Sequence, residues 1–180
     1  MRVERLLAIG LLLALAAAVA LVAWLGSEQR SPTGGTAEAA PSGDSAVVER
    51  VIDGDTIVVE LDGRRERVRY VGVDAPELAN REAGTVAECW GEEARDANAG
   101  MLDGAEVRLE RDTSDRDRFG RLLRHVWVAR SGQWHLVAEE LAAAGAVEAR
   151  SYPPDTRRDD ELERAEGAAR RAGLGLWGGC

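Results

Sequence analysis

The chain has 180 residues, of which 45% are hydrophobic and 31% charged, and its formal net charge is -9. This length allows one domain with a sizeable core and is too short for two ordinary domains. The acidic balance excludes a protein that attracts nucleic acid nonspecifically through its overall charge, because such proteins are usually basic. Any phosphate that the chain handles must be attracted by local arginines or by a metal ion.

The first 26 residues predict a membrane anchor or a signal peptide. Residues 6–25 are all apolar or glycine, and they follow Arg2 and Arg5. Twenty apolar residues match a hydrocarbon core of about 30 Å, and the basic start favours a cytoplasmic N-terminus. Ala18-Val-Ala20 resembles a cleavage site, but six more apolar residues follow it and favour an uncleaved anchor. The rest of the chain is expected outside the cytoplasm, either held by a single-pass anchor or secreted.

Residues 27–45 are rich in Ser, Thr, Gly, Pro and Ala and have no hydrophobic period. This composition predicts a flexible linker. The remaining residues, 46–180, are then the folded domain.

The two cysteines of the chain are Cys89 and the C-terminal Cys180. In an exported domain an even number of cysteines permits a disulfide. Closing a loop of about 90 residues would contribute roughly 4 kcal/mol if the bond is unstrained. Two free thiols are the alternative, and export favours the bridge.

Short strands and a few helices are expected in the folded domain. Asp62-Gly63 is a strong hairpin signal between two strand-like runs. The expected strands cover residues 47–52, 56–61, 67–73, 107–111 and 122–128. The expected helices, from apolar periodicity and terminal glycines, cover residues 87–102, 136–144 and 159–172. This order predicts an α+β domain with a small five-stranded β-barrel and about three helices, which fits an OB-fold.

A first pair of carboxylates, Asp53 and Asp55, flanks Gly54. Residues two apart on an extended backbone point to the same side of a strand, and the glycine allows a bend that aims both carboxylates at one point. Taken alone, the motif is an ordinary Asp-Gly turn. It gains meaning only from a second acidic pair nearby.

That second pair, Asp74 and Glu77, brackets Ala75-Pro76 at the end of the third expected strand. Pro76 restricts Ala75 to an extended conformation, which allows the Ala75 carbonyl to serve as a further oxygen ligand. The region contains neither His nor Cys, so the donor set favours a hard cation over zinc.

Two arginines accompany the acidic residues. Arg69 lies on the strand face opposite Val68, and Arg121 enters a strand after a turn. An arginine within a strand is often only a solvated residue of the outer face. A pair of guanidinium groups, however, suits a phosphate, since each is always charged and forms two parallel hydrogen bonds.

These motifs together resemble the staphylococcal nuclease (thermonuclease) family. The resemblance covers roughly residues 47–177 and is carried by four motifs in order: Asp53-Gly-Asp55-Thr56, Arg69, Asp74-Ala-Pro-Glu77 and Asp117-Arg-Phe-Gly-Arg121. It implies an OB-fold and a calcium-dependent phosphodiesterase that acts on DNA and RNA. The family breaks the bond to the 5′ oxygen and leaves 3′-phosphate ends.

The resemblance also implies roles for individual residues. Asp55, Asp74 and the Ala75 carbonyl would hold Ca²⁺, with Asp53 close by. Glu77 would act as the general base toward water.

Two further roles concern the substrate. Arg69 and Arg121 would bind the scissile phosphate, and the substrate contacts would come from Arg118, Phe119 and Tyr152. The chain departs from the family pattern at these contacts, because Phe119 replaces a common Tyr and Tyr152 stands alone where the family reference has two tyrosines. At the metal site, Ala75 stands where Thr is common, a change that a carbonyl ligand tolerates.

A nuclease of this kind would have DNA or RNA as its partner, would contact the membrane through an uncleaved anchor, and is expected to be a monomer. The main alternative is a noncatalytic OB-fold module that binds nucleic acid or another ligand. The complete set of arginines and carboxylates favours the enzyme. A calcium-stabilised surface domain would not explain the two arginines.

His125 and His135 lack partners at catalytic or metal-binding spacing and are expected to be structural.

Overall fold

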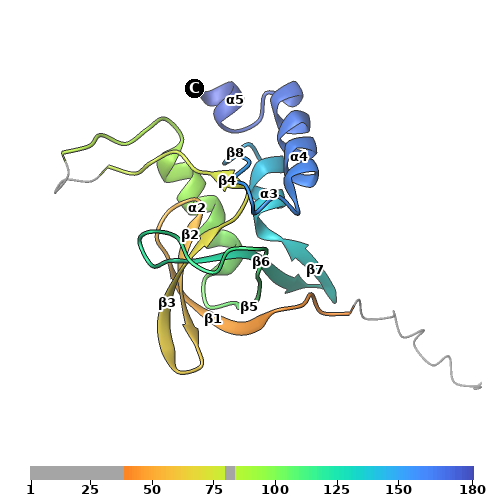
Figure 1. Ribbon diagram of the computed structural model, residues 1–180. Coiled ribbons are helices and arrows are strands. Elements are labelled where there is room, and N and C mark those ends of the chain that lie inside the picture. Colours follow the sequence, from red (N-terminus) through yellow and green to blue (C-terminus); the bar gives the residue numbers. More distant parts are fainter. Residues whose placement is uncertain (1–38, 80–83) are drawn as a thin grey trace, which may run out of the picture. The chain divides into compact units, whose positions relative to one another are not determined.

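A computed structural model describes residues 39–79 and 84–180 (Figure 1). The predicted anchor or signal peptide and most of the predicted linker lie outside the described residues. Within the described ranges, none of the helices combines the length and apolar character that crossing a bilayer requires.

Five strands form a closed barrel. Antiparallel pairing follows the order β3-β2-β1-β5-β6, and a parallel pairing of β3 with β6 closes the ring. The strands are β1 (Asp44–Val51), β2 (Thr56–Leu61), β3 (Arg64–Tyr70), β5 (Glu106–Glu110) and β6 (Leu122–Arg130). A sixth strand, β7 (Gln133–Leu136), extends the sheet as a hairpin on β6. The predicted α+β fold with an OB-fold barrel is confirmed.

The β2–β3 hairpin forms because Asp62 and Gly63 both adopt positive φ, 51° and 72°. Two central residues of this kind match the right-handed twist of the flanking strands. Alternate residues of the hairpin then point into the barrel, where Ile57, Val59 and Val68 are fully buried. Arg69, the next residue on β3, therefore points to the outer face, as the sequence predicts.

Three helices and one short terminal turn accompany the barrel: the first two pack on it, the third packs on the second, and the terminal turn packs on the third (Figure 1). They are α2 (Gly91–Leu102), α3 (Val137–Ala143), α4 (Asp159–Ala172) and α5 (Leu176–Gly179). Helix α2 connects to the site through Asn98, whose side chain accepts a hydrogen bond from the Tyr70 hydroxyl at 2.9 Å and donates one to the Asp53 carbonyl at 2.9 Å. Helix α2 thus holds the turn that carries the first acidic pair.

The predicted third strand, 67–73, is wrong in its extent. Strand β3 ends at Tyr70, and Gly72 turns the chain with φ of 84°. Beyond the turn, β4 (Val73–Asp74) pairs with β8 (Glu148–Ala149) in a separate two-stranded sheet. A side chain at Gly72 would also meet the buried Leu162, because a Cβ there would lie 2.4 Å from its Cδ1.

Other predicted boundaries also differ from the structure, most of all the starts of α2 and β1. Helix α2 starts at Gly91 rather than at residue 87, because Trp90 adopts a left-handed conformation with φ of 74°. Strand β1 starts at Asp44, two residues before the predicted domain start, because Asp44 already pairs with Leu109 of β5.

Candidate active site

Arg69 lies at the centre of the site and contacts both acidic motifs. Its Nη1 lies 2.9 Å from Asp55 Oδ2, and its Nη2 donates to Asp74 Oδ1 at 2.8 Å. Nη1 also donates to the carbonyls of Val73 at 2.8 Å and Tyr70 at 3.1 Å. With only 12% of its side chain exposed, Arg69 is the counter-ion of two carboxylates that would otherwise repel each other.

Asp55 is a buried carboxylate, with 5% of the residue exposed. Its Oδ1 accepts a hydrogen bond from the Thr56 hydroxyl at 2.9 Å, and its Oδ2 accepts one from the Ala75 amide at 2.7 Å. Burial raises the pKa of Asp55 to about 7, the Arg69 charge and these hydrogen bonds oppose the rise, and Asp53 adds to it. The site therefore presents a desolvated carboxylate whose anionic form needs a cation.

Asp53 and Asp55 are brought together by a bend and not by an extended strand. The Asp53 carboxylate accepts a hydrogen bond from the Asp55 amide at 3.0 Å. A Cβ at Gly54 would lie 2.7 Å from the Cβ of Ala75 and 2.9 Å from that of Ala94. The turn therefore requires glycine because it packs directly against the second acidic motif and helix α2. The bend that the sequence allows at Gly54 is present.

The donor set of this region suits a hard cation. Asp55 and Asp74 meet at the Arg69 guanidinium, and Ala75 is hydrogen-bonded to Asp55. Among residues 39–79 and 84–180, no three His, Cys, Asp or Glu side chains are arranged to hold a metal ion by themselves. Two carboxylates and a backbone carbonyl would leave further positions to water, which Ca²⁺ accepts.

Glu77, the predicted general base, lies just beyond Pro76 and is exposed on a segment that is otherwise mostly half-buried. Its pKa is raised above the usual 4.5, first by partial burial and then by the charges of Asp53, Asp74 and Glu88, with Arg69 opposing the rise. A carboxylate with a raised pKa is a stronger base near neutral pH. The environment of Glu77 therefore suits proton abstraction.

The backbone of Glu77 is held by Glu88, which lies just before the start of helix α2. Its amide donates to Glu88 Oε2 at 3.0 Å, and its carbonyl accepts from the Glu88 amide at 2.8 Å. The next residue, Cys89, forms a disulfide with Cys180, with their Cα atoms 6.0 Å apart. Gly91 packs so closely that a Cβ there would lie 2.7 Å from the Glu77 carbonyl oxygen. The chain terminus is thus covalently linked to the segment that positions Glu77.

Arg121 approaches the site from the loop between β5 and β6. Asp117 organises this loop, because its Oδ1 accepts from the amides of Phe119 and Arg121, each at 2.9 Å. Its Oδ2 accepts from Arg121 Nε at 2.6 Å. These bonds hold Arg121 Nε in place, and the guanidinium lies 5.6 Å from the centroid of the Phe119 ring. Its two Nη atoms have no hydrogen-bond or ion-pair partner within the part of the chain that the structure describes.

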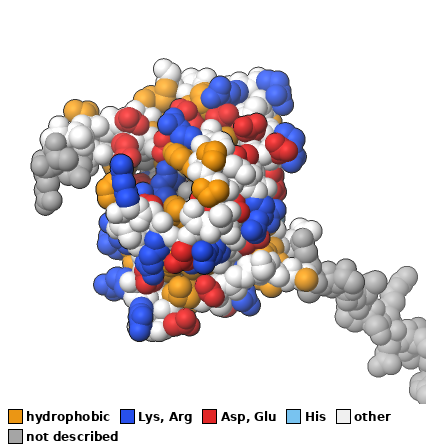
Figure 2. Space-filling model, in the orientation of Figure 1, with side chains coloured by type: hydrophobic (Ala, Val, Ile, Leu, Met, Phe, Trp, Pro, Cys, Tyr) orange, Lys and Arg blue, Asp and Glu red, His pale blue; other side chains and the backbone are white. Residues whose placement is uncertain are grey.

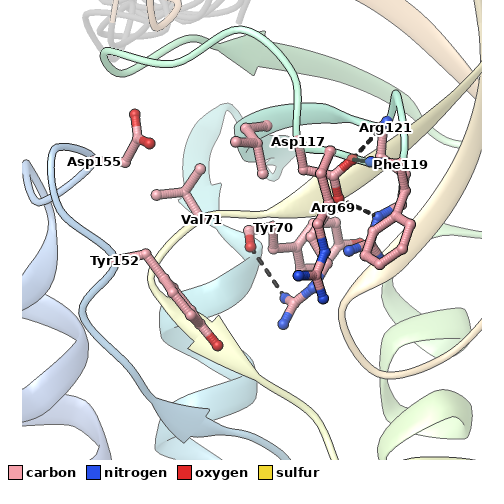
Figure 3. Close-up of a pocket in the computed structure, with 10 residues that line it drawn as sticks. Arg69, Tyr70, Val71, Asp117, Phe119, Arg121, Tyr152 and Asp155 are labelled. Atoms are coloured by element: carbon pink, nitrogen blue, oxygen red, sulfur yellow. Dashed lines mark hydrogen bonds and ion pairs between the residues drawn. The ribbon is translucent and has the colours of Figure 1, made fainter.

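A pocket of about 390 Å³ lies between this loop, Arg69 and the segment around Tyr152. Figure 3 shows the Arg69 side chain between the ring of Phe119 on one side and the ring of Tyr152 on the other. Phe119 is 69% exposed, with the Arg118 guanidinium 4.7 Å from its ring centroid. Figure 2 shows a hollow on this face with basic side chains in it and hydrophobic side chains beside it. Exposed rings beside guanidinium groups are suited to stacking bases along a phosphate backbone.

The sequence reasoning missed Arg150, which directly follows strand β8. Its Nε lies 3.4 Å from Asp74 Oδ2, and its side chain is 52% exposed. Its amide donates to the Gly72 carbonyl at 2.8 Å. The only signal in the sequence was the closeness of Arg150 to Tyr152, and the pairing of β8 with β4 that brings it to Asp74 was not predicted.

The two histidines lie away from the acidic cluster, in agreement with the structural roles expected for them. His125 is buried in β6, and burial lowers its pKa. His135 Nδ1 lies 2.9 Å from Glu140 Oε1.

The fold and the site define a small OB-fold barrel with a carboxylate–guanidinium cluster at one edge. Residues 67–179 match the family model described as staphylococcal nuclease homologue. The chain is 36% identical over 130 residues to a thermonuclease of Staphylococcus hyicus, covering 72% of this chain and 73% of the relative. It is also 35% identical over 135 residues to the endonuclease YncB of Bacillus subtilis strain 168, covering 74% and 61%. The chain belongs to the staphylococcal nuclease family, which confirms the resemblance seen in the sequence.

Proposed function

We propose that the protein is a calcium-dependent nuclease that hydrolyses phosphodiester bonds of DNA or RNA and leaves 3′-phosphate ends. The observation that carries this proposal is the convergence of Asp55 and Asp74 on Arg69 beside the pocket. Membership of the family supports a nuclease, and the two relatives compared above bear the names thermonuclease and endonuclease.

In this proposal Asp55, Asp74 and the Ala75 carbonyl hold the calcium ion, with Asp53 nearby. A bound dication supplies positive charge close to the phosphoryl oxygens, where negative charge develops during hydrolysis. With both carboxylates neutralised in this way, Arg69 Nη2 would be available to donate to the phosphate, while Nη1 keeps its bonds to the Val73 and Tyr70 carbonyls. Arg69 thereby has one role in the metal-free protein and another with substrate.

Glu77 takes a proton from the water whose oxygen forms a new bond to phosphorus. The bond from phosphorus to the 5′ oxygen breaks, and that oxygen leaves as a hydroxyl after taking a proton from solvent. Arg121 donates from its free Nη atoms to the phosphoryl oxygens while Asp117 holds its Nε. A donor aimed at the developing charge typically accounts for a hundredfold or more in rate. Phe119, Tyr152 and Arg118 form the walls against which the substrate bases lie.

The N-terminal segment places this activity outside the cytoplasm in our proposal, on a single-pass anchor or as a secreted protein. The domain is proposed to act as a monomer. The nucleic acid binds despite the net negative charge of the chain, because the guanidinium groups that line the pocket attract its phosphates.

The test uses the full-length protein in a mild detergent, incubated with plasmid and single-stranded DNA in calcium or in excess chelator. We expect cutting in calcium only, with 3′-phosphate ends on the products. Arg69→Ala is expected to lose at least a hundredfold in rate, and Glu77→Gln to lose activity while still binding DNA. Binding of DNA without cutting by the folded wild type would instead indicate a noncatalytic OB-fold module.

A further inference from the structure

The three guanidinium groups around the acidic pair differ in which of their nitrogens are occupied. Arg69 uses both Nη atoms on carboxylates and backbone carbonyls. Arg121 uses Nε on Asp117, with both Nη atoms unpaired among the described residues. A guanidinium that contacts a carboxylate through Nε keeps its two Nη atoms available to donate to a phosphate.

Arg150 also faces a carboxylate with its Nε, through an ion pair rather than the short hydrogen bond that Arg121 makes. The Arg150 Nε lies 3.4 Å from Asp74 Oδ2, and its Nη atoms have no hydrogen-bond partner in the part of the chain that the structure describes. Its backbone is fixed by the bond from its amide to the Gly72 carbonyl. Burial and the charge of Asp74 raise the pKa of Tyr152 in the pocket wall, and the charges of Arg69 and Arg150 oppose the rise.

A purely structural role does not account for Arg150. Asp74 already has a counter-ion in Arg69, which contacts its other oxygen, Oδ1, at 2.8 Å. The Arg150 side chain is half exposed, and exposed ion pairs add little to stability. The Arg150 guanidinium thus lies at the site with its two Nη atoms available to bind a ligand.

We propose that Arg150 binds a backbone phosphate next to the scissile one, an inference that rests on the proposed nuclease function. Arg69 and Arg150 contact opposite oxygens of Asp74, so one carboxylate separates them and they face neighbouring phosphates. The ligand is therefore a nucleic acid strand with at least one phosphodiester beyond the bond that is cut. Arg150 acts as a substrate-binding residue that favours oligonucleotides over dinucleotides.

The test compares wild type, Arg150→Gln and Arg150→Lys with Arg171→Gln, a control at an exposed arginine in the last turn of α4. Full-length proteins in detergent cleave a single-stranded 12-mer and a dinucleotide with one phosphodiester, both in calcium. Binding of the 12-mer is measured separately in chelator at several salt concentrations. Melting temperatures confirm that each variant is folded.

For Arg150→Gln we expect KM on the 12-mer to rise about tenfold, as for a lost charge-assisted hydrogen bond, with kcat unchanged. The slope of log Kd against log salt should fall by about 0.7, the value for one phosphate contact on a single strand. Arg150→Lys should keep the salt slope and recover part of the affinity, because lysine keeps the positive charge but cannot form the two parallel hydrogen bonds of a guanidinium. On the dinucleotide the variants and wild type should be equal.

Equal KM and equal salt slope for Arg150→Gln and wild type on the 12-mer would overturn the inference. A loss of the same size on the dinucleotide would overturn the assignment to a flanking phosphate. If the wild type does not cut DNA, the nuclease proposal fails, and the salt slope in chelator still decides whether Arg150 contacts a phosphate.

Discussion

Replacing Asp155 should loosen both walls of the pocket at once. This residue is buried, with 5% exposed, and its Oδ1 accepts hydrogen bonds from the amides of Thr113 at 2.9 Å and Ser114 at 2.6 Å. Thr113 and Ser114 begin the loop that carries Arg121, whereas Asp155 follows the segment of Tyr152. One carboxylate therefore holds the two segments together.

The size of the effect follows from the two amides. Asp155→Ala leaves both donors without their acceptor, and each unsatisfied buried donor costs about 1–3 kcal/mol. Because the loop is partly exposed and water can reach it, we expect a total loss of about 2–3 kcal/mol in the free energy of unfolding. Asp155→Asn keeps an acceptor oxygen and loses only the charge, so about 1 kcal/mol is expected.

The effect should depend on pH in a defined direction. Burial would raise the pKa of Asp155, but hydrogen bonds from Ser114 and Thr113 lower it below the usual 3.8. A carboxyl whose pKa is lower in the folded state contributes stability above its unfolded pKa, and this contribution is lost as the pH falls through its folded pKa. The difference between wild type and Asp155→Asn should therefore shrink below about pH 4.

Urea unfolding followed by tryptophan fluorescence, at pH 7 and in steps toward acid, measures these differences. The cleavage assay on the same proteins should show a higher KM for Asp155→Ala. Unfolding of Asp155→Ala at the same urea concentration as wild type at pH 7 would refute the reasoning. If the difference in the free energy of unfolding between wild type and Asp155→Asn stays constant into the acid range, the pH argument is refuted.

Three further perturbations test other parts of the account. Replacing Cys89 and Cys180 by serine should lower the free energy of unfolding by about 4 kcal/mol. Cleavage should also slow, because the segment that holds the Glu77 backbone is no longer linked to Cys180. Equal urea midpoints for the wild type with and without reductant would contradict the stability effect. Calcium at a hundred times its Kd should stabilise the wild type by about 2.7 kcal/mol, and a thermal shift of equal size in Asp55→Asn would argue against that ligand. Phe119→Ala should weaken binding of single-stranded DNA by about 1–3 kcal/mol at unchanged stability, as anisotropy in chelator can measure.

Features with strong local signals were predictable from the sequence. The β2–β3 hairpin follows from Asp62-Gly63, and α4 has the predicted limits because acidic residues begin it and Gly173 ends it. The placement of Arg69 on the outer strand face likewise follows from the period of two in β3.

Features that depend on distant pairing were not predictable. Strands β4 and β8 have two residues each, and only their contact with each other, Val73 with Ala149 and Asp74 with Glu148, makes them strands. The same contact brings Arg150 to Asp74, so its place in the site could not be read from local sequence. The close packing of Gly54 against Ala75 and Ala94 depends on the folded arrangement in the same way.

The most direct test of the account is single-turnover cleavage of a labelled oligonucleotide in calcium by wild type and Glu77→Gln. The account predicts that both proteins bind the oligonucleotide with similar affinity, that wild type cuts it only in calcium, and that the variant is slower by at least a hundredfold. Equal cleavage rates for the two proteins would contradict the role of Glu77 as the base. Wild-type cleavage that persists in excess chelator would contradict the calcium-dependent site.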